Sequence, residues 1–145
     1  MKFTQVLLGV AATVLVLVGC SYQGPKTSPG GTTTLANTYW KLLSIDGDEV
    51  VTAEGAREAH LILRPDFRVT GFGGCNNFSG TWLEEEDQLS IGPLMSTKMA
   101  CDDAPYERDL LANLDGRIFA DIEGEILTVL GSNGSEMIFQ AVYLQ

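Results

Sequence analysis

The sequence predicts a mainly β domain of the α+β class. The expected fold is a curled antiparallel sheet or small β-barrel of about eight strands, with one α-helix (about 104–115) packed on one side. Short runs of strand-forming residues recur between tight-turn signals along most of the chain. One stretch carries apolar residues at helical spacing. The 145 residues suffice for one domain with a modest core, and a helix can cover an open end of a curled sheet.

Five strands are expected before the helix. The first is rich in strand formers, with Trp40 and Leu42 on one face, and it ends at the turn residues Asp46-Gly47-Asp48. The second and third form a hairpin around Pro65-Asp66, and Gly92-Pro93 interrupts the fifth. These five strands are expected at residues 38–45, 60–65, 68–72, 78–84 and 89–94.

The helix is predicted from an apolar face and from signals at both ends. Asp102 and Asp103 can cap its start, Pro105 suits a first turn, and Gly116 can end it. Its apolar face is formed by Tyr106, Leu110, Leu111 and Leu114. Closing strands are expected at residues 117–122, 126–130 and 136–144, with a hairpin signal at Asn133-Gly134.

A turn-rich stretch at residues 71–80 is expected to organise the fold. It holds four glycines and two asparagines, which favour turns, but aromatic residues among them indicate that the turn is packed. A second segment, residues 96–101, is expected to lie beside it. The Asn76 amide can satisfy backbone groups in the turn, and we predict at Gly74 a backbone conformation that a β-branched residue cannot share.

The first nineteen residues resemble the signal peptide of a bacterial lipoprotein. Lys2 supplies a short positive region, and residues 6–18 are apolar apart from Gly9 and Thr13 but too short to span a bilayer comfortably. The tetrapeptide at 17–20, Leu-Val-Gly-Cys, resembles a lipobox, in which the signal is cut before the cysteine and Cys20 becomes lipidated. The alternative is an ordinary signal peptide with a chance cysteine.

After the signal peptide, residues 20–34 are expected to be a lipidated cysteine followed by a flexible tether. The segment is rich in Ser, Thr, Gly and Pro. Ser21, in place of an acidic residue after the cysteine, is similar to signals for outer-membrane sorting. We therefore expect a cell-envelope protein, anchored by its lipid in the outer membrane and facing the periplasm.

Two cysteines, Cys75 and Cys101, remain for the folded domain. An even pair in an oxidising compartment favours a disulfide. Such a bridge would close a loop of about 26 residues, worth on the order of 3–4 kcal/mol in the chain-entropy model. The alternative is two buried free thiols.

The charge balance argues against nucleic-acid binding. The net charge is −10, and the nine basic residues form no visible patch among the nineteen acidic ones. Phosphate contacts need clustered Lys and Arg, so we expect no nucleic-acid partner.

Two motifs and a helical glutamate occur in order along the chain: Gly71-x-Gly73-Gly74-Cys75-Asn76-x-x-x-Gly80, then Ser96-Thr97-Lys98-Met99-Ala100-Cys101, then Glu107. Together they resemble the META domain family, which includes the heat-shock protein HslJ. The resemblance covers residues 35–145; it departs from the family pattern at Lys98, where Arg is usual, and at Asn77, where a basic residue is frequent. It implies a barrel-like fold with a helix, an envelope location, often as a lipoprotein, and no established catalytic activity.

We expect no enzyme, no catalytic residue, no metal and no cofactor. His60 is the only histidine, and nothing in the sequence orients it as a base for a cysteine nucleophile, so we expect a solvated side chain. The Cys and His residues are too few for a structural zinc site. A cysteine-dependent redox enzyme remains a third hypothesis, supported only by Cys75 and Cys101.

The motif residues are the candidates for a ligand contact, each with a structural alternative. Lys98 could instead be a surface residue whose stem covers Trp82, and Glu107 could pair with Lys98 or favour the helix dipole. Met95 and Met99 are expected to fill the core. The candidate contacts are Gly74, Asn76, Gly80, Thr97, Lys98 and Glu107.

Together with the lipobox and the tether, the resemblance to the META domain family implies a non-enzymatic envelope lipoprotein that supports stress or antibiotic tolerance by binding a partner. Its expected partners are the membrane, through Cys20, and an unknown protein. The alternative is a carrier that holds a lipid or small hydrophobic ligand inside the barrel. Aromatic side chains could line such a cavity or fill the interior solid: Trp40, Phe72, Phe78, Trp82 and Phe119.

Overall fold

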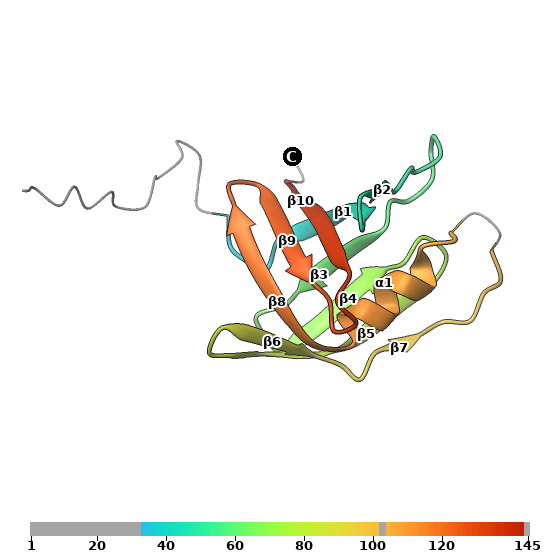
Figure 1. The fold of residues 1–145 in the computed structure, drawn as a ribbon. Coiled ribbons are helices and arrows are strands. Elements are labelled where there is room, and N and C mark those ends of the chain that lie inside the picture. Colours follow the sequence, from blue (N-terminus) through green and yellow to red (C-terminus); the bar gives the residue numbers. More distant parts are fainter. Residues whose placement is uncertain (1–32, 102–103, 144–145) are drawn as a thin grey trace, which may run out of the picture.

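The computed structural model describes residues 33–101 and 104–143 (Figure 1). The predicted signal peptide, the predicted lipidation site Cys20 and nearly all of the expected tether lie outside the described residues. So do the two aspartates expected to cap the helix, Asp102 and Asp103. Within the described part, no helix is long and apolar enough to cross a membrane.

Eight strands form a closed antiparallel barrel, as the sequence predicts. Each strand pairs with the next in the order β1-β3-β4-β5-β6-β8-β9-β10, and β10 pairs back to β1 to close the cylinder. Closure leaves no free edge along these pairings. The barrel strands are β1 (Tyr39–Ile45), β3 (His60–Leu63), β4 (Arg68–Phe72), β5 (Asn77–Glu85), β6 (Gln88–Ile91), β8 (Gly116–Glu123), β9 (Ile126–Leu130) and β10 (Glu136–Val142).

Two short strands outside the barrel were not expected from the sequence. β2 (Asp48–Glu49) folds back on the end of β1. β7 (Met95–Ser96) pairs with the start of β5, whereas β6 pairs with the end of β5. The expected fifth strand, residues 89–94, ends early at Ile91, because Gly92 takes a positive φ of 117°, and β7 begins only after its predicted end.

Large apolar side chains fill the barrel interior. Alternation along each strand directs every second residue inward, and the inward set forms one continuous hydrophobic cluster. Trp40 and Phe139 are fully buried, and the Trp40 Nε1 donates to the Leu35 carbonyl at 3.0 Å. The other large side chains less than 2% exposed are Leu42, Leu61, Leu63, Val69, Leu110, Leu114, Ile118, Leu127, Val129 and Met137.

Three of the five aromatic residues named above face this core, and two do not. Trp40, Phe78 and Trp82 are buried. Phe119 is 48% exposed because its neighbour on β8, Ile118, takes the inward position. Phe72 is half-buried on the outer face of β4, so neither it nor Phe119 lines the interior.

The helix α1 (Glu107–Leu114) is shorter at its start than expected. Tyr106 occupies the N-cap position with no side-chain cap, and Pro105 lies in the turn before it. Leu110 and Leu114 are fully buried against the barrel core. The last helical turn passes directly into β8 through Gly116, whose φ is 125°.

Candidate functional site: a polar knot beside an exposed strap

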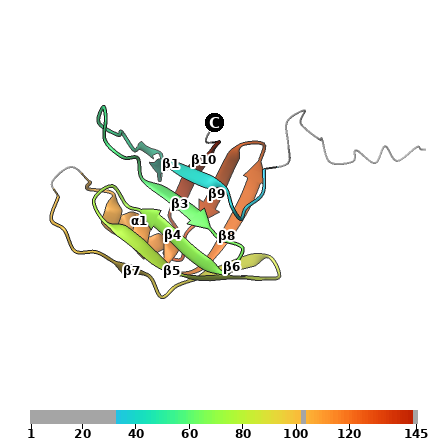
Figure 2. The same ribbon diagram turned by 180° about the vertical axis from the view of Figure 1, so that it is seen from behind.

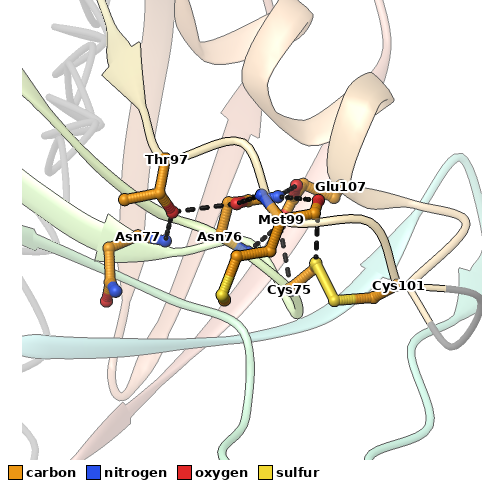
Figure 3. The surroundings of a disulfide bond; sticks show 7 residues. All are labelled: Cys75, Asn76, Asn77, Thr97, Met99, Cys101 and Glu107. Atoms are coloured by element: carbon orange, nitrogen blue, oxygen red, sulfur yellow. Dashed lines mark hydrogen bonds between the residues drawn. A yellow bond between two sulfur atoms is a disulfide. The ribbon is translucent and has the colours of Figure 1, made fainter.

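The turn after β4 is joined to the segment after β7 by a disulfide, as the sequence predicts. Cys75 and Cys101 are 26 positions apart, and their Cα atoms lie 5.8 Å from each other. The bond fixes the far end of residues 95–101, which run along the outside of β5 and which we call the strap (Figure 3). Every residue of the strap is exposed.

Asn76 ties the strap to the turn with all four hydrogen-bonding positions of its buried side chain (Figure 3). Its Oδ1 accepts from the Met99 backbone N–H at 2.7 Å and from the Thr97 hydroxyl at 2.8 Å. Its Nδ2 donates to the Met99 carbonyl at 3.1 Å and to Glu107 Oε1 at 2.7 Å. The amide therefore pairs with Met99 much as a neighbouring strand would.

Glu107 ties the start of the helix to the same turn. Its Oε2 accepts from the backbone N–H groups of Cys75, at 2.9 Å, and Asn76, at 2.5 Å, while Oε1 holds the Asn76 side chain. Hydrogen bonds to a carboxylate are about twice as strong as neutral ones. Three donors bind the carboxylate, and among the described residues no salt bridge joins it to the exposed Lys98, so the Glu107–Lys98 pair that the sequence suggested does not form.

Two glycines allow this close approach. Gly74 has a φ of 110°, as its predicted special conformation requires, and a Cβ there would lie 2.7 Å from the Tyr106 hydroxyl. A Cβ at Gly73 would lie 2.6 Å from Glu107. Burial and the nearby Glu107 carboxylate raise the pKa of Tyr106. We call the assembly of the disulfide with Asn76, Thr97, Met99 and Glu107 the polar knot.

The sequence matches the META domain over residues 33–142. The chain belongs to the META domain family. No curated protein matches it.

Solved structures share the fold of this META domain at low sequence identity. A Burkholderia xenovorans protein solved by NMR has a TM-score of 0.62 at 22% identity, covering 84% of this chain and 99% of its own. A second NMR structure has a TM-score of 0.60 at 18% identity, covering 75% and 95%. A DUF4847 family protein from Bacteroides vulgatus has a TM-score of 0.53 at 12% identity, covering 77% and 96%.

Four of the six candidate contact residues of the META motif meet in or beside the polar knot. They are Gly74, Asn76, Thr97 and Glu107. Gly80 lies elsewhere, where a Cβ would be 2.8 Å from the Pro93 carbonyl oxygen. Lys98 is exposed on the strap, and the pairing of Ser96 with Phe78 places Lys98 level with Asn76. The expectation that the Lys98 stem covers Trp82, which lies six residues beyond Asn76 in the chain, is therefore wrong.

Met95 and Met99 do not fill the core, contrary to expectation. They are 70% and 58% exposed. Met95 pairs with Ser79, an outward-facing residue of β5, so its side chain takes the outer face of the sheet. Only the pairing of β7 with β5 reveals this orientation, and a six-residue segment carries too little periodicity to predict it.

His60 is half-buried and stacked, rather than solvated as expected. Its ring lies 4.3 Å from the Tyr39 ring, and its Nδ1 is 3.0 Å from the Glu58 carbonyl oxygen. Burial lowers the pKa of His60, although the Glu58 carbonyl partly opposes the shift. The disulfide leaves neither Cys75 nor Cys101 as a thiol that such a base could activate.

A surface groove that the sequence did not predict lies outside the barrel, beside α1. Its volume is about 520 Å³, and it lies among the β1–β2 turn, the helix and the β9–β10 hairpin. Four carboxylates line it: Asp46, Asp48, Glu49 and Asp109. Among the described residues, no group of three or more His, Cys, Asp or Glu side chains could hold a metal ion.

Proposed function

We propose that this META domain protein is a non-enzymatic lipoprotein of the bacterial envelope that binds a partner protein and so supports tolerance of stress or antibiotics. One observation carries the proposal: the polar groups of the motif residues are bonded to one another and hold an exposed segment in a fixed shape. Asn76 uses all four of its hydrogen-bonding positions, and Glu107 binds three donors.

This use of the motif residues supports binding over catalysis. A general base or nucleophile needs a free lone pair near the reacting atom. In the polar knot the carboxylate of Glu107 already accepts from two backbone N–H groups and one amide. The knot therefore acts as a scaffold, and the surface that it shapes is the strap.

The lipobox and the tether support the envelope location. Lipidation of Cys20 would keep the domain near a membrane, and residues 21–34 would give it reach. A membrane-held binding module gains effective concentration toward other envelope proteins. The net charge of −10 disfavours direct contact of the domain with anionic lipid, so the lipid itself would supply the attachment.

The carrier alternative has less support. A carrier needs a hollow interior, and the barrel interior holds tightly buried side chains such as Trp40, Phe139 and Met137. The groove of about 520 Å³ lies outside the barrel and has four carboxylates on its walls, which suit an apolar ligand poorly. Native mass spectrometry of protein made in its own host distinguishes the two: a bound lipid mass would favour the carrier.

Gene deletion in the native host tests the proposal. We expect the deletion strain to be more sensitive than its parent to heat or to amphipathic antibiotics. Complementation with the wild-type chain should restore tolerance, and Cys20→Ser, which removes the lipidation site, should not. A deletion strain that grows like its parent under both stresses would contradict the proposed function.

A further inference from the structure

The strap has one backbone edge that pairs with the barrel and one that does not. Ser96 pairs with Phe78, and the Thr97 N–H donates to the Asn77 carbonyl at 3.0 Å. In an antiparallel pair, alternate residues direct their N–H and C=O groups to opposite sides. Ser96 and Lys98 therefore direct theirs away from β5, where they have no backbone partner among the described residues.

This outer edge faces solvent. Figures 1 and 2 both place β7 at the lower rim of the molecule, outside β5, with no other element beyond it. The exposure of every residue from 95 to 101 agrees with that position. The strap thus forms a free strand edge outside the closed eight-strand barrel, as β2 does beside β1.

The strap is held extended along its length. At its start the Leu94 N–H lies 3.4 Å from Asp115 Oδ2, and Met95 pairs with Ser79. At its far end Met99 is bound by Asn76, and the disulfide holds Cys101. A segment fixed in the conformation that a partner would bind loses little entropy on binding.

We propose that the outer edge of the strap binds an extended peptide segment of a partner protein by β-strand addition, an assignment that rests on the proposed function. The N–H and C=O groups of Ser96 and Lys98 pair with the peptide backbone. Met95, Thr97 and Met99 share one face, and the two methionines lie about 14 Å apart at strand spacing. Their flexible side chains contact apolar residues at alternate peptide positions.

Charge selects between a foreign peptide and a second copy of this chain. Each copy carries a net charge of −10, so two copies repel each other. The net negative charge of the whole chain attracts a segment flanked by basic residues. The strap itself carries one charged side chain, Lys98, so the basic residues belong outside the paired positions of the peptide. The occupant that fits is therefore an extended, apolar peptide with lysine or arginine on either side.

The test uses a fluorescently labelled peptide of alternating valine and threonine flanked by lysines, and the purified full chain in detergent micelles. Fluorescence anisotropy measures binding. Lys98→Pro removes the outward N–H and should weaken binding about tenfold, as expected for one lost hydrogen bond with its steric conflict. The matched control, Lys98→Ala, keeps the N–H and should stay within about twofold of wild type.

Hydrogen exchange of residues 95–100 gives a second measurement on the wild-type protein, independent of how the proline variant folds. The peptide should slow exchange there and leave the β8–β10 region unchanged. Equal affinity for wild type and Lys98→Pro, protection at another surface, no binding, or a wild-type dimer in light scattering would each overturn the assignment. If the peptide does not bind but the deletion strain is still more sensitive than its parent, only the assignment of the strap edge fails. If the peptide binds but the deletion strain grows like its parent, only the proposed function fails.

Discussion

The barrel wall and the strap are held in place by different forces. In the wall, buried apolar side chains such as Trp40 and Phe139 pack inside the barrel, and closed strand pairing satisfies the backbone. In the strap, every side chain is exposed, and one disulfide with a few polar atoms of Asn76 and Glu107 supplies the restraint. The wall spreads its stability over many contacts, whereas the strap depends on a few atoms that can be removed singly.

The largest effect is expected in the wall, from Phe139→Ala. Phe139 is fully buried, so truncation removes its transfer energy and leaves a cavity, for a loss of about 3–5 kcal/mol in the free energy of unfolding. Phe119→Ala is the matched control, since that ring is 48% exposed, and should cost less than about 1 kcal/mol. Urea denaturation measures both. Similar losses for the two phenylalanines would contradict the assignment of inner and outer faces on β8 and β10.

Removing the disulfide should have the next largest effect. The double variant Cys75→Ala with Cys101→Ala removes the cross-link between two positions that are 26 residues apart in the sequence. It should lower the free energy of unfolding by about 2–4 kcal/mol. Reduction of the wild-type protein should lower its melting temperature toward that of the variant. The variant itself should not respond to reductant. Equal melting temperatures for wild type with and without reductant would show that the bond contributes little.

A smaller loss is expected from Glu107→Ala. The backbone N–H groups of Cys75 and Asn76 lose their acceptor in a partly buried turn, which should cost about 2 kcal/mol. Glu107→Gln keeps one carbonyl acceptor and should cost about half as much. In hydrogen exchange, residues 95–100 should open more in the alanine variant than the barrel strands do. Uniform opening of strap and wall would show that the knot does not act locally.

The sequence predicted the wall better than the strap because the wall follows local rules. Alternating apolar residues and turn signals at Pro65-Asp66 and Asn133-Gly134 recur over short distances, and they located all eight barrel strands to within a few residues. Cysteine pairing in the folded domain predicted the disulfide, because only Cys75 and Cys101 remained. These inferences need no knowledge of long-range register.

The strap could not be predicted in this way because its contacts join distant positions. Asn76 and Glu107 are 31 positions apart, and no local pattern indicates that the carboxylate accepts from that turn. The exposure of Met95 and Met99 follows from the pairing of β7 with β5, which a short segment does not encode. Phe119 was considered for the barrel interior but is exposed, for a related reason: strand register decides which face of a strand points inward, and a shift of one residue exchanges the two faces.

The smallest expected effect concerns His60, on the outer face of the wall. Burial lowers the pKa of this ring, so the folded state takes up a proton less readily than the unfolded chain, whose histidine titrates near pH 6.5. As pH falls below about 6.5 the unfolded state binds more protons, and the contribution of His60 to stability is lost. Because water still reaches the half-buried ring, the loss should stay under about 1 kcal/mol.

His60→Phe isolates this contribution, since it can keep the stack on Tyr39 and does not titrate. The two proteins carry the same carboxylates and differ at one titratable residue, so the difference between their losses of unfolding free energy from pH 7.5 to pH 5.5 reports His60. Wild type should lose more than the variant over that range. Parallel losses would mean that the ring gains no protection from its place between Tyr39 and Phe72, and that this part of the outer face is as open to water as the strap.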